Sequence, residues 1–326
     1  MNFRNNSHQI PILLCFDTNY ANYAAVATYS AYKNAKSPLI FYWMATADSK
    51  ESAEKLKQHL KKLGIEIELH LLDLSGIRDW KTGFHFTTAN YLRLFAPDLL
   101  LNTDRVIYID CDTLVLKDLR DIYNHQLSGS HFAGVEDEAG ARTSKVPRDA
   151  KDKYINAGVL LMDLKSLRDD GFLRRSKALY AVYEKQITWV DQCIINKYAE
   201  GKKVILDPKW NRQIFAQSIK EKDFIKLANC EVSSILHFVG GTKPWQQWCN
   251  PAISEFWWKY AQDLQIEDLK PMQINTVEQL ISLADVLHLN SRFEEASSKK
   301  TLAIQTLIQH ISQLQSKPDY TYSFRS

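Results

Sequence analysis

The chain has 326 residues, of which 45% are hydrophobic, and its 41 basic and 38 acidic residues give a formal net charge of +3. This length suits one large α/β domain, with or without an appendage, and this hydrophobic fraction is enough to bury a full core. The even charge balance argues against a nucleic-acid-binding protein, whose basic residues would dominate one surface, so we expect no nucleic-acid partner.

Cysteine usage and hydropathy predict the compartment. The chain has five scattered cysteines and no Cys-x-x-Cys pair: Cys15, Cys111, Cys193, Cys230 and Cys249. This pattern is typical of free thiols in a reducing compartment. The N-terminus lacks a signal-peptide pattern, and no run approaches the roughly 18 apolar residues that span a bilayer. We therefore expect a cytoplasmic protein without a transmembrane segment, and peripheral membrane contact stays open.

Short apolar runs alternate with helical patterns along the chain. They predict strands at residues 10–16, 39–45, 65–74, 105–110, 132–137, 156–164, 202–207 and 233–240. Helical spacing predicts helices at residues 51–64, 87–100, 174–185 and 188–201. Strands separated by helices need crossover connections. We therefore expect an α/β fold with a mostly parallel central sheet and helices on both faces.

The character of the chain changes near Asp263. No glycine occurs after Gly241, and the segment that follows has helical spacing, with Leu307, Ile311 and Leu314 on one face. We predict a main domain over residues 1–262 and a C-terminal helical appendage over residues 263–326.

Two aspartates, Asp110 and Asp112, come at the end of the apolar run at 105–110. Ligands of open α/β sheets bind beyond the carboxyl ends of the strands, and residues i and i+2 of an extended segment point the same way. Both carboxylates could therefore reach one divalent cation such as Mg²⁺ or Mn²⁺, which commonly completes its shell with phosphate oxygens. The alternative is that one aspartate caps a turn and the other is solvated.

A second segment, HFVGGTKPW at residues 237–245, adds complementary chemistry. His237 offers an imidazole ligand, Gly240 and Gly241 allow close approach of the backbone to a ligand, and Lys243 offers a charge suited to phosphate. Taken alone, this stretch also fits a surface loop with a satisfied histidine and a solvated lysine. Its combination with the Asp-x-Asp strand end is a much more specific pattern than either segment alone.

Six segments in order resemble glycosyltransferase family 8 over nearly the whole first 250 residues. They are CFDTNYANYAAVATYSAYKN, TTANYLRLFAPDLL, RVIYIDCDTLVLKDL, YINAGVLLMDLKSLR, VDQCIINK and HFVGGTKPW. The nearest likeness is to bacterial lipopolysaccharide α-galactosyl- and α-glucosyltransferases, and glycogenin is a more distant relative. One departure is Cys193, which follows Asp-Gln where some relatives have a third polar residue.

The resemblance implies a single Rossmann-like nucleotide-sugar transferase domain of the GT-A type. It implies a retaining hexosyltransferase that moves glucose or galactose from a UDP-hexose donor to a glycan acceptor, such as lipopolysaccharide, another surface glycan or a glycoprotein glycan. The implied cofactor is Mn²⁺ or Mg²⁺. Two alternatives stay open: a catalytically silent UDP-sugar-binding or interaction module, and self-glucosylation as in glycogenin, for which Tyr320 and Tyr322 are available.

The resemblance also assigns roles to individual residues. It implies metal binding by Asp110, Asp112 and His237; phosphate binding by Gly240 and Lys243; uridine binding by Asp17, Asn19 and Tyr20, with the Tyr20 ring stacked on uracil; and donor contacts from Cys15, Phe16, Cys111 and His85. It implies that Arg93, Asn156, Ala157, Asp191 and Gln192 line the donor sugar and that Asp137 lies on the sugar side. Of these, Arg93, Asp137, Asp191 and Gln192 are the implied catalytic groups.

Each of these side chains also has a purely structural explanation. Tyr20 could pack in the core, Arg93 could pair with Asp98, Asn156 could occupy a turn, and Asp191 could be a charge favoured by a helix N-terminus. For each residue taken alone, the structural explanation is favoured. For all of them together, in the order in which they occur, a binding site is favoured.

Overall fold

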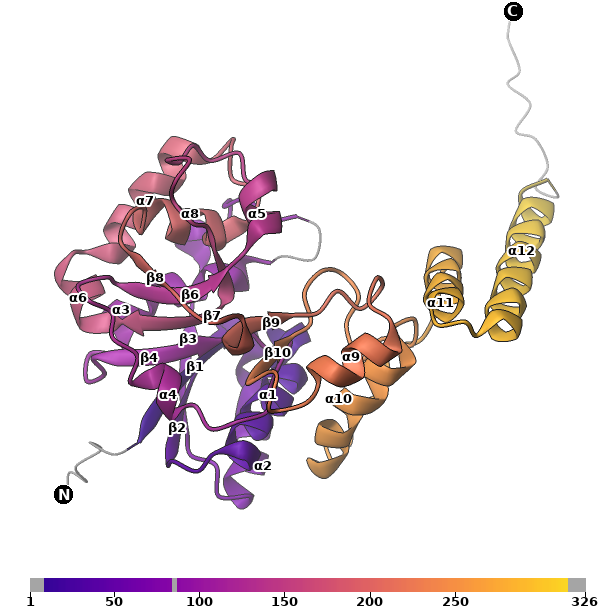
Figure 1. Cartoon of the computed structure of the whole chain (residues 1–326), viewed down its shortest axis with the longest axis horizontal. Coiled ribbons are helices and arrows are strands. Elements are labelled where there is room, and N and C mark those ends of the chain that lie inside the picture. The colour runs from indigo at the N-terminus through magenta and orange to yellow at the C-terminus, as the bar shows by residue number, and fades with distance from the viewer. Residues whose placement is uncertain (1–8, 84–86, 316–326) are drawn as a thin grey trace, which may run out of the picture.

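A seven-stranded sheet forms the centre of the protein in a computed structural model that describes residues 9–83 and 87–315 (Figure 1). The strand order is β3-β2-β1-β4-β7-β6-β8. The strands are β1 (Ile10–Phe16), β2 (Leu39–Thr46), β3 (Ile67–Leu72), β4 (Arg105–Ile109), β6 (Phe132–Glu136), β7 (Ile155–Asp163) and β8 (Lys203–Ile205). All neighbours are parallel except β7, which is antiparallel to β4 and to β6. The expected α/β fold with a mostly parallel sheet is therefore confirmed.

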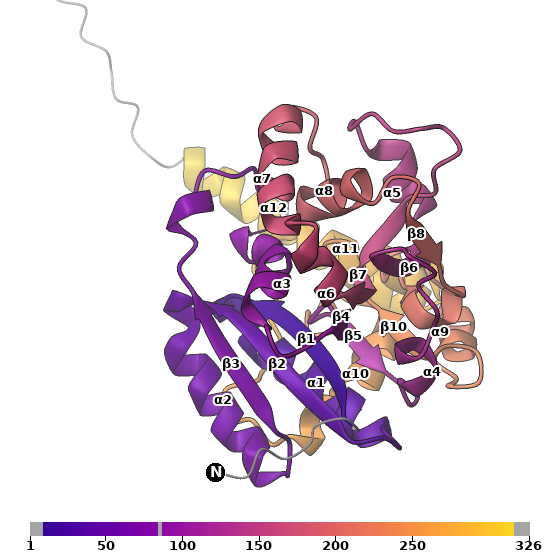
Figure 2. The same ribbon diagram turned by 90° about the vertical axis from the view of Figure 1, so that its left-hand side faces the viewer.

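Alternate residues of the central strands enter two separate cores. In β1, Ile12, Leu14 and Phe16 pack on one face, and Leu13 and Cys15 pack on the other. The first face is covered by α1 (Ala21–Asn34), α2 (Lys50–Lys62) and α10 (Pro251–Asp263). The second is covered by α6 (Leu164–Asp169), α7 (Phe172–Tyr183) and α8 (Val190–Tyr198). Helices thus cover both faces of the sheet, whose strong twist is visible in Figure 2.

A second, three-stranded sheet brings together segments that are far apart in the sequence. It has the order β5-β10-β9 and consists of β5 (Thr113–Val115), β9 (Arg212–Gln213) and β10 (Ile235–His237). The antiparallel pairing of β5 with β10 sets His237 opposite Thr113. The strand expected at residues 233–240 is therefore shorter and belongs to this sheet. The pairing delivers His237 to the residues that directly follow β4.

The helix expected over residues 87–100 is divided in two. A 3₁₀ helix, η4 (Thr88–Phe95), is followed by α3 (Ala96–Leu99). Pro97 lies at the start of α3 and has no N–H to continue the hydrogen-bond ladder of the preceding turns. The remaining short elements are η1 (Thr18–Tyr20), η2 (Ala47–Ser49), η3 (Ser75–Ile77), α4 (Arg120–Tyr123), α5 (Glu138–Thr143), η5 (Pro208–Asn211) and α9 (Glu221–Leu227).

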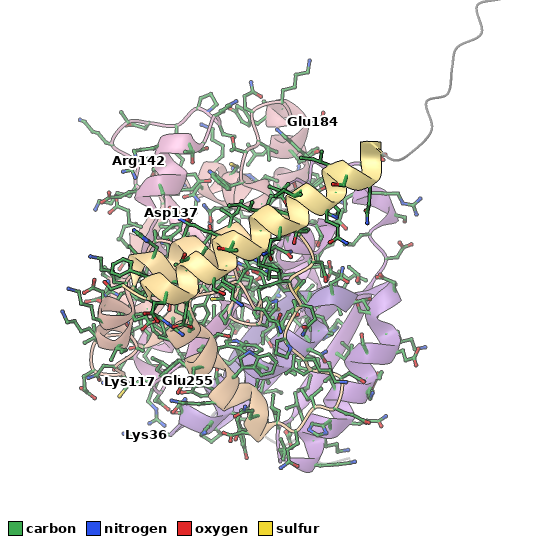
Figure 3. The ribbon with its side chains drawn as sticks, turned by 90° about the vertical axis from the view of Figure 1, so that its right-hand side faces the viewer. Lys36, Lys117, Asp137, Arg142, Glu184 and Glu255 are labelled. Carbon is green, nitrogen blue, oxygen red and sulfur yellow. The ribbon has the colours of Figure 1, made fainter. Side chains whose placement is uncertain are left out.

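The C-terminal segment is helical, as expected. Helices α11 (Val277–Leu289) and α12 (Phe293–Gln315) pair with each other beyond α9 and α10, and α12 lies outermost on this side (Figures 1 and 3). Leu283 and Leu287 of α11 pack on Trp248. The division of the chain at residues 262 and 263 stays a prediction. Among the described residues, no helix is both long enough and apolar enough to cross a bilayer.

Helix α1 holds β5 in place through two polar side chains. The Ser30 hydroxyl accepts a hydrogen bond from the Val115 N–H at 2.9 Å and donates to the Ala27 carbonyl at 2.7 Å. The Asn34 amide donates to the Val115 carbonyl at 2.9 Å. These bonds satisfy both backbone groups of Val115 and so anchor the segment that follows Asp112.

We expect Ser30→Ala to lower the free energy of unfolding by about 1–3 kcal/mol, because the buried Val115 N–H loses its acceptor. Denaturant unfolding monitored by fluorescence measures this change. Ser312→Ala is the matched control, since that exposed hydroxyl bonds only to the Ile308 carbonyl of its own helix, and we expect a change within about 0.5 kcal/mol. Equal losses in the two variants would contradict the prediction.

Candidate active site

One pocket gathers most of the predicted site residues. Those that line it are Cys15, Phe16, Asp17, Tyr20, Arg93, Asp110, Cys111, Asp112, Asp137, Asn156, Ala157, Asp191, Gln192, His237, Gly240 and Lys243. Asn19 is exposed and does not line the pocket. His85 lies outside the described residues. The pocket lies at the carboxyl ends of β1 and β4, where ligands of open α/β sheets bind.

Asp110 and Asp112 lie in a turn rather than on an extended strand. Strand β4 ends at Ile109, and a turn over Cys111 and Asp112 leads into β5. The two carboxylates do converge, but the expected cause, the alternation of side chains along a strand, is wrong. The turn, closed by a 2.7 Å hydrogen bond from the Thr113 hydroxyl to the Asp110 carbonyl, brings them together instead.

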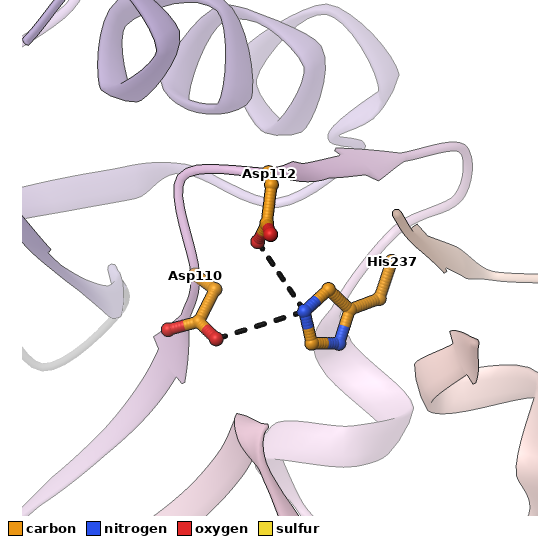
Figure 4. A group of neighbouring side chains, drawn as sticks. All are labelled: Asp110, Asp112 and His237. Atoms are coloured by element: carbon orange, nitrogen blue, oxygen red, sulfur yellow. Dashed lines mark ion pairs between the residues drawn. The ribbon is translucent and has the colours of Figure 1, made fainter. Parts of the chain in front are cut away.

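The two carboxylates meet the imidazole of His237 (Figure 4). His237 Nε2 lies 3.3 Å from Asp112 Oδ1 and 3.6 Å from Asp110 Oδ2. One ligand atom from each of the three residues lies within 4.8 Å of the others. Two carboxylate oxygens and one imidazole nitrogen around a common point are a donor set that fits a divalent cation.

Lys243 provides a buried positive charge beside this set. Its ammonium lies 2.6 Å from Asp112 Oδ2 and donates to the Phe238 carbonyl at 2.8 Å. Burial alone would raise the pKa of Asp112, but Lys243 and His237 outweigh it and hold the pKa well below its usual range. Asp112 is therefore an anion, as a metal ligand must be.

Arg93 connects two carboxylates from distant parts of the chain. Its guanidinium is buried and lies 3.0 Å from Asp110 Oδ1 and 2.9 Å from Asp191 Oδ2. It also donates to the Ala157 carbonyl at 2.5 Å and lies 4.0 Å from the centre of the Tyr108 ring. The alternative pairing with Asp98 does not occur, because Arg93 points into the pocket.

Asp191 lies in the first turn of α8 and is 2% exposed. Burial raises its pKa to about 7, although Arg93 opposes the shift. Val190, the residue before it, has φ of +34°, which is unusual for a β-branched side chain. Backbone strain of this kind is found at functional sites, where the surrounding structure enforces it. Here it accompanies the turn that delivers Asp191 and Gln192 to the pocket.

Asp137 gathers two amide side chains. Its Oδ2 accepts hydrogen bonds from Gln192 Nε2 at 3.0 Å and from Asn156 Nδ2 at 3.3 Å, and its Oδ1 accepts from the Gly140 N–H at 2.7 Å. The oxygen of Gln192 accepts from the Ala157 N–H at 2.9 Å. Since a backbone N–H can only donate, this bond fixes which end of the Gln192 amide faces Asp137.

Asp17 organises the opposite part of the pocket. Its Oδ1 accepts from the N–H groups of Asn19 and Tyr20 at 3.0 and 3.2 Å, and its Oδ2 accepts from the Thr87 hydroxyl at 2.8 Å. The Tyr20 ring packs edge-on against Trp245, with 5.9 Å between centroids, and also lines the pocket. The core-packing role and the proposed ligand-binding role of Tyr20 are therefore compatible.

Sequence analysis missed several residues that line the pocket, and it missed three residues that lie against Asp110 or His237. The Tyr108 hydroxyl donates to Asp110 Oδ1, and Asn211 contacts the outer nitrogen of His237. Gly158 lies against His237 and Asp110, where a β-carbon would come within 2.1 Å of His237 Cε1 and 2.7 Å of Asp110 Oδ2. Gly158 follows Asn156 and Ala157 in the segment YINAGVLLMDLKSLR, so the family resemblance could have identified it. Nothing in the local sequence marks Asn211.

We expect Gly158→Ala to weaken Mn²⁺ binding by about 10- to 100-fold, because the added methyl group must displace His237 or Asp110. Calorimetric titration of the metal-free protein with Mn²⁺ measures the effect. Gly76→Ala is the control, since a β-carbon there meets nothing within 4 Å. Unchanged Mn²⁺ binding by the Gly158→Ala variant would show that the three side chains do not share a cation.

Known proteins are similar to this chain in sequence. The chain is 27% identical over 248 residues to General stress protein A of Bacillus subtilis (strain 168). The matched region covers 72% of this chain and 86% of that protein. It is 25% identical over 254 residues to Lipopolysaccharide 1,2-glucosyltransferase of Escherichia coli (strain K12), covering 75% of each. It is 22% identical over 232 residues to Lipopolysaccharide 1,3-galactosyltransferase of Salmonella typhimurium, covering 68% of each.

Solved structures share the fold. The galactosyltransferase LgtC, solved in complex with donor and acceptor sugar analogues, superposes with a TM-score of 0.70 at 21% sequence identity, over 79% of this chain and 97% of LgtC. The GT-A type of fold is thereby confirmed. The model of the family named Glycosyl transferase family 8 matches residues 11–249. With that match across most of the chain, the protein belongs to glycosyl transferase family 8.

Proposed function

We propose that the protein is a retaining hexosyltransferase that moves glucose or galactose from a UDP-sugar to a glycan acceptor, with Mn²⁺ or Mg²⁺ as cofactor. The observation that carries the proposal is the convergence of Asp110, Asp112 and His237 on one point beside Lys243. A diphosphate bound there would meet a cation and an ammonium, which are the two groups that stabilise negative charge on a leaving phosphate.

The relatives support a sugar donor and a glycan acceptor. Two of them are named as lipopolysaccharide glucosyl- and galactosyltransferases, and LgtC was solved with analogues of both substrates. We therefore propose a surface glycan such as lipopolysaccharide as the first acceptor to test.

The donor end of the pocket suits a nucleoside. We propose that Asp17, Asn19 and Tyr20 hold uridine, with the Tyr20 ring against uracil. The carboxylate of Asp17 is already fixed by three hydrogen bonds, so it offers a preorganised edge. The side chains of Cys15, Phe16 and Cys111 form the adjoining apolar wall.

Asp110, Asp112 and His237 would hold the cation, which when bound would act as a Lewis acid on the diphosphate. The imidazole favours Mn²⁺ over Mg²⁺, because nitrogen ligands suit transition metals better. Lys243 is already held in the pocket by the Phe238 carbonyl. Its ammonium can move from Asp112 to a phosphate oxygen once a cation neutralises that carboxylate. Gly240 has φ of +83° and brings the backbone close to the same oxygens.

The sugar end supports attack by the acceptor on the face from which UDP leaves. Asp191 and Asp137 would favour the positive charge that grows on the ring, and Arg93 holds Asp191 in place. Double displacement would need a nucleophile, and Gln192 is a poor one because its oxygen carries no full charge and already accepts the Ala157 N–H. Front-face attack therefore needs Gln192 only as a positioning group, with a phosphate oxygen accepting the acceptor's proton.

A catalytically silent sugar-binding module is the second candidate, because fold alone does not establish activity. The presence of every ion-binding side chain, with Lys243 buried and paired, argues against it. Self-glucosylation would use Tyr320 or Tyr322, which lie outside the described residues. The five cysteines, all within the described part of the chain, are free thiols, which supports the proposed cytoplasmic location.

We expect slow hydrolysis of UDP-glucose or UDP-galactose with Mn²⁺ and no acceptor, and the donor that is cleaved identifies the sugar. Chelator should abolish UDP release, and Asp110→Asn should lower it by about 100-fold or more. Asp104→Asn is the matched control, because that side chain is 79% exposed just before β4, and it should leave the rate unchanged. If neither donor is cleaved and UDP binding shows no dependence on Mn²⁺, the proposed metal site is wrong.

We expect Gln192→Ala to lower this rate by about 100-fold, and we expect the glycoside that the variant forms with an added sugar or alcohol acceptor to keep the anomeric configuration of the donor, as measured by NMR. Intact-mass analysis of the variant incubated with donor should find no glycosylated protein. A covalent sugar adduct on any side chain would contradict the front-face mechanism but not the proposed donor, acceptor or cofactor.

A further inference from the structure

Asn211 lies behind the metal-ligand set, on the side of His237 that faces away from the carboxylates. It is the last residue of η5 and is 1% exposed. Its Oδ1 lies 3.0 Å from His237 Nδ1, and its Nδ2 lies 2.9 Å from Asn156 Oδ1. Asn211 therefore touches the imidazole without facing the pocket, where it is absent from the lining.

A single backbone donor fixes the direction of every bond in this chain of side chains. The Gly158 N–H can only donate, and its acceptor at 2.9 Å is Asn156 Oδ1. Since that oxygen also faces Asn211, Asn211 must present its NH₂ group to it. The carbonyl of Asn211 then faces His237. The Nδ1 atom of His237 must therefore carry a proton in order to donate to it.

The consequence lies on the other side of the ring. In a neutral imidazole with its proton on Nδ1, Nε2 has a free lone pair. That lone pair points at Asp110 Oδ2 and Asp112 Oδ1, which lie 3.6 and 3.3 Å away. Three electron-rich atoms facing one another repel unless a cation lies among them. A proton on Nε2 would instead occupy the direction along which a metal must bind.

We propose that Asn211 is a positioning residue that holds His237 in the Nδ1–H tautomer and in the ring orientation that makes Nε2 a metal ligand. The role in metal binding rests on the proposed function, whereas the tautomer belongs to the chain itself. Partners that accept the outer N–H of a ligating histidine orient the ring and raise its basicity, and their loss typically weakens metal binding by about 10- to 100-fold.

The tautomer is tested first, in the metal-free wild-type protein. Long-range ¹H–¹⁵N correlation spectra at alkaline pH distinguish a protonated from an unprotonated ring nitrogen, and a His237→Gln variant identifies the signals. We expect protonated Nδ1 and unprotonated Nε2. We expect Asn211→Ala to move proton population to Nε2. A neutral wild-type His237 that carries its single proton on Nε2, with Nδ1 unprotonated, would overturn the proposal, whatever the variants do.

Mn²⁺ binding is tested second, by calorimetric titration with Mn²⁺ alone. Asn211→Ala should weaken binding by about 10- to 100-fold, whereas Asn211→Asp, whose carboxylate still accepts the Nδ1 proton but loses the donor to Asn156 Oδ1, should lose less affinity than Asn211→Ala. Asn250→Ala is the control for loss of a buried amide: Asn250 is 0% exposed, caps α10, bonds to the Ile219 carbonyl and does not line the pocket. It should lower stability and leave Mn²⁺ binding unchanged.

The outcomes separate this proposal from the proposed function. If wild type binds no Mn²⁺, the metal site fails, and the spectra still decide the tautomer. If wild type binds Mn²⁺ and Asn211→Ala binds it equally well, the positioning role fails and the metal site stands. If Asn211→Asp loses as much affinity as Asn211→Ala, the acceptor at Nδ1 is not what matters, and the proposal is wrong. Should Asn211→Ala fail to fold, the wild-type spectra and the Asn211→Asp titration still test it.

Discussion

An excess of negative charge at the carboxyl end of β4 is the constraint on which the site depends. Among the described residues, the carboxylates of Asp110, Asp112 and Asp191 pair with two buried cations, Arg93 and Lys243. Removing one partner from a buried ion pair leaves an uncompensated charge, which is strongly destabilising. The protein reduces this imbalance by holding the pKa of Asp191 near 7, and His237 adds a third electron-rich atom facing Asp110 and Asp112. A bound divalent cation would complete the balance, which explains why so much acid can be collected in one place.

The fold class was predictable because it follows from hydrophobic patterns within short stretches of the sequence. Apolar runs separated by helical repeats predicted the α/β fold. Two of these runs end next to Asp17 and at Asp110, and the structure shows that they form the neighbouring strands β1 and β4. Hydrophobic periodicity is a property of short windows, so it survives without knowledge of the tertiary structure. The site residues implied by family resemblance mostly line one pocket, although their individual roles stay predictions.

The contacts between distant segments were not predictable from any window. Arg93 was considered as a partner of nearby Asp98, yet it pairs with Asp110 and Asp191, which the sheet and α8 bring to it. The Asp-x-Asp segment was expected to be extended, yet it turns because β5 leaves the central sheet to pair with β10. Asn211 has ordinary neighbours in the sequence. Its importance comes only from the face of His237 that it contacts, and chain topology alone creates that contact.

Strand β7 supplies the reference to which both halves of the site are aligned. It is antiparallel to both neighbours, and its consecutive N–H groups at Ala157 and Gly158 act on different sides. The Ala157 N–H fixes the amide of Gln192, and the Gly158 N–H fixes Asn156 and, through it, Asn211 and His237. Such directional control requires donors that cannot flip, and backbone N–H groups meet that requirement where side-chain amides do not. It also requires small side chains next to the site, since a β-carbon on residue 158 would collide with His237. The Asn-Ala-Gly segment therefore combines an amide that relays hydrogen bonds with two small residues, and it aligns the group expected to hold the metal with the group expected to position the sugar.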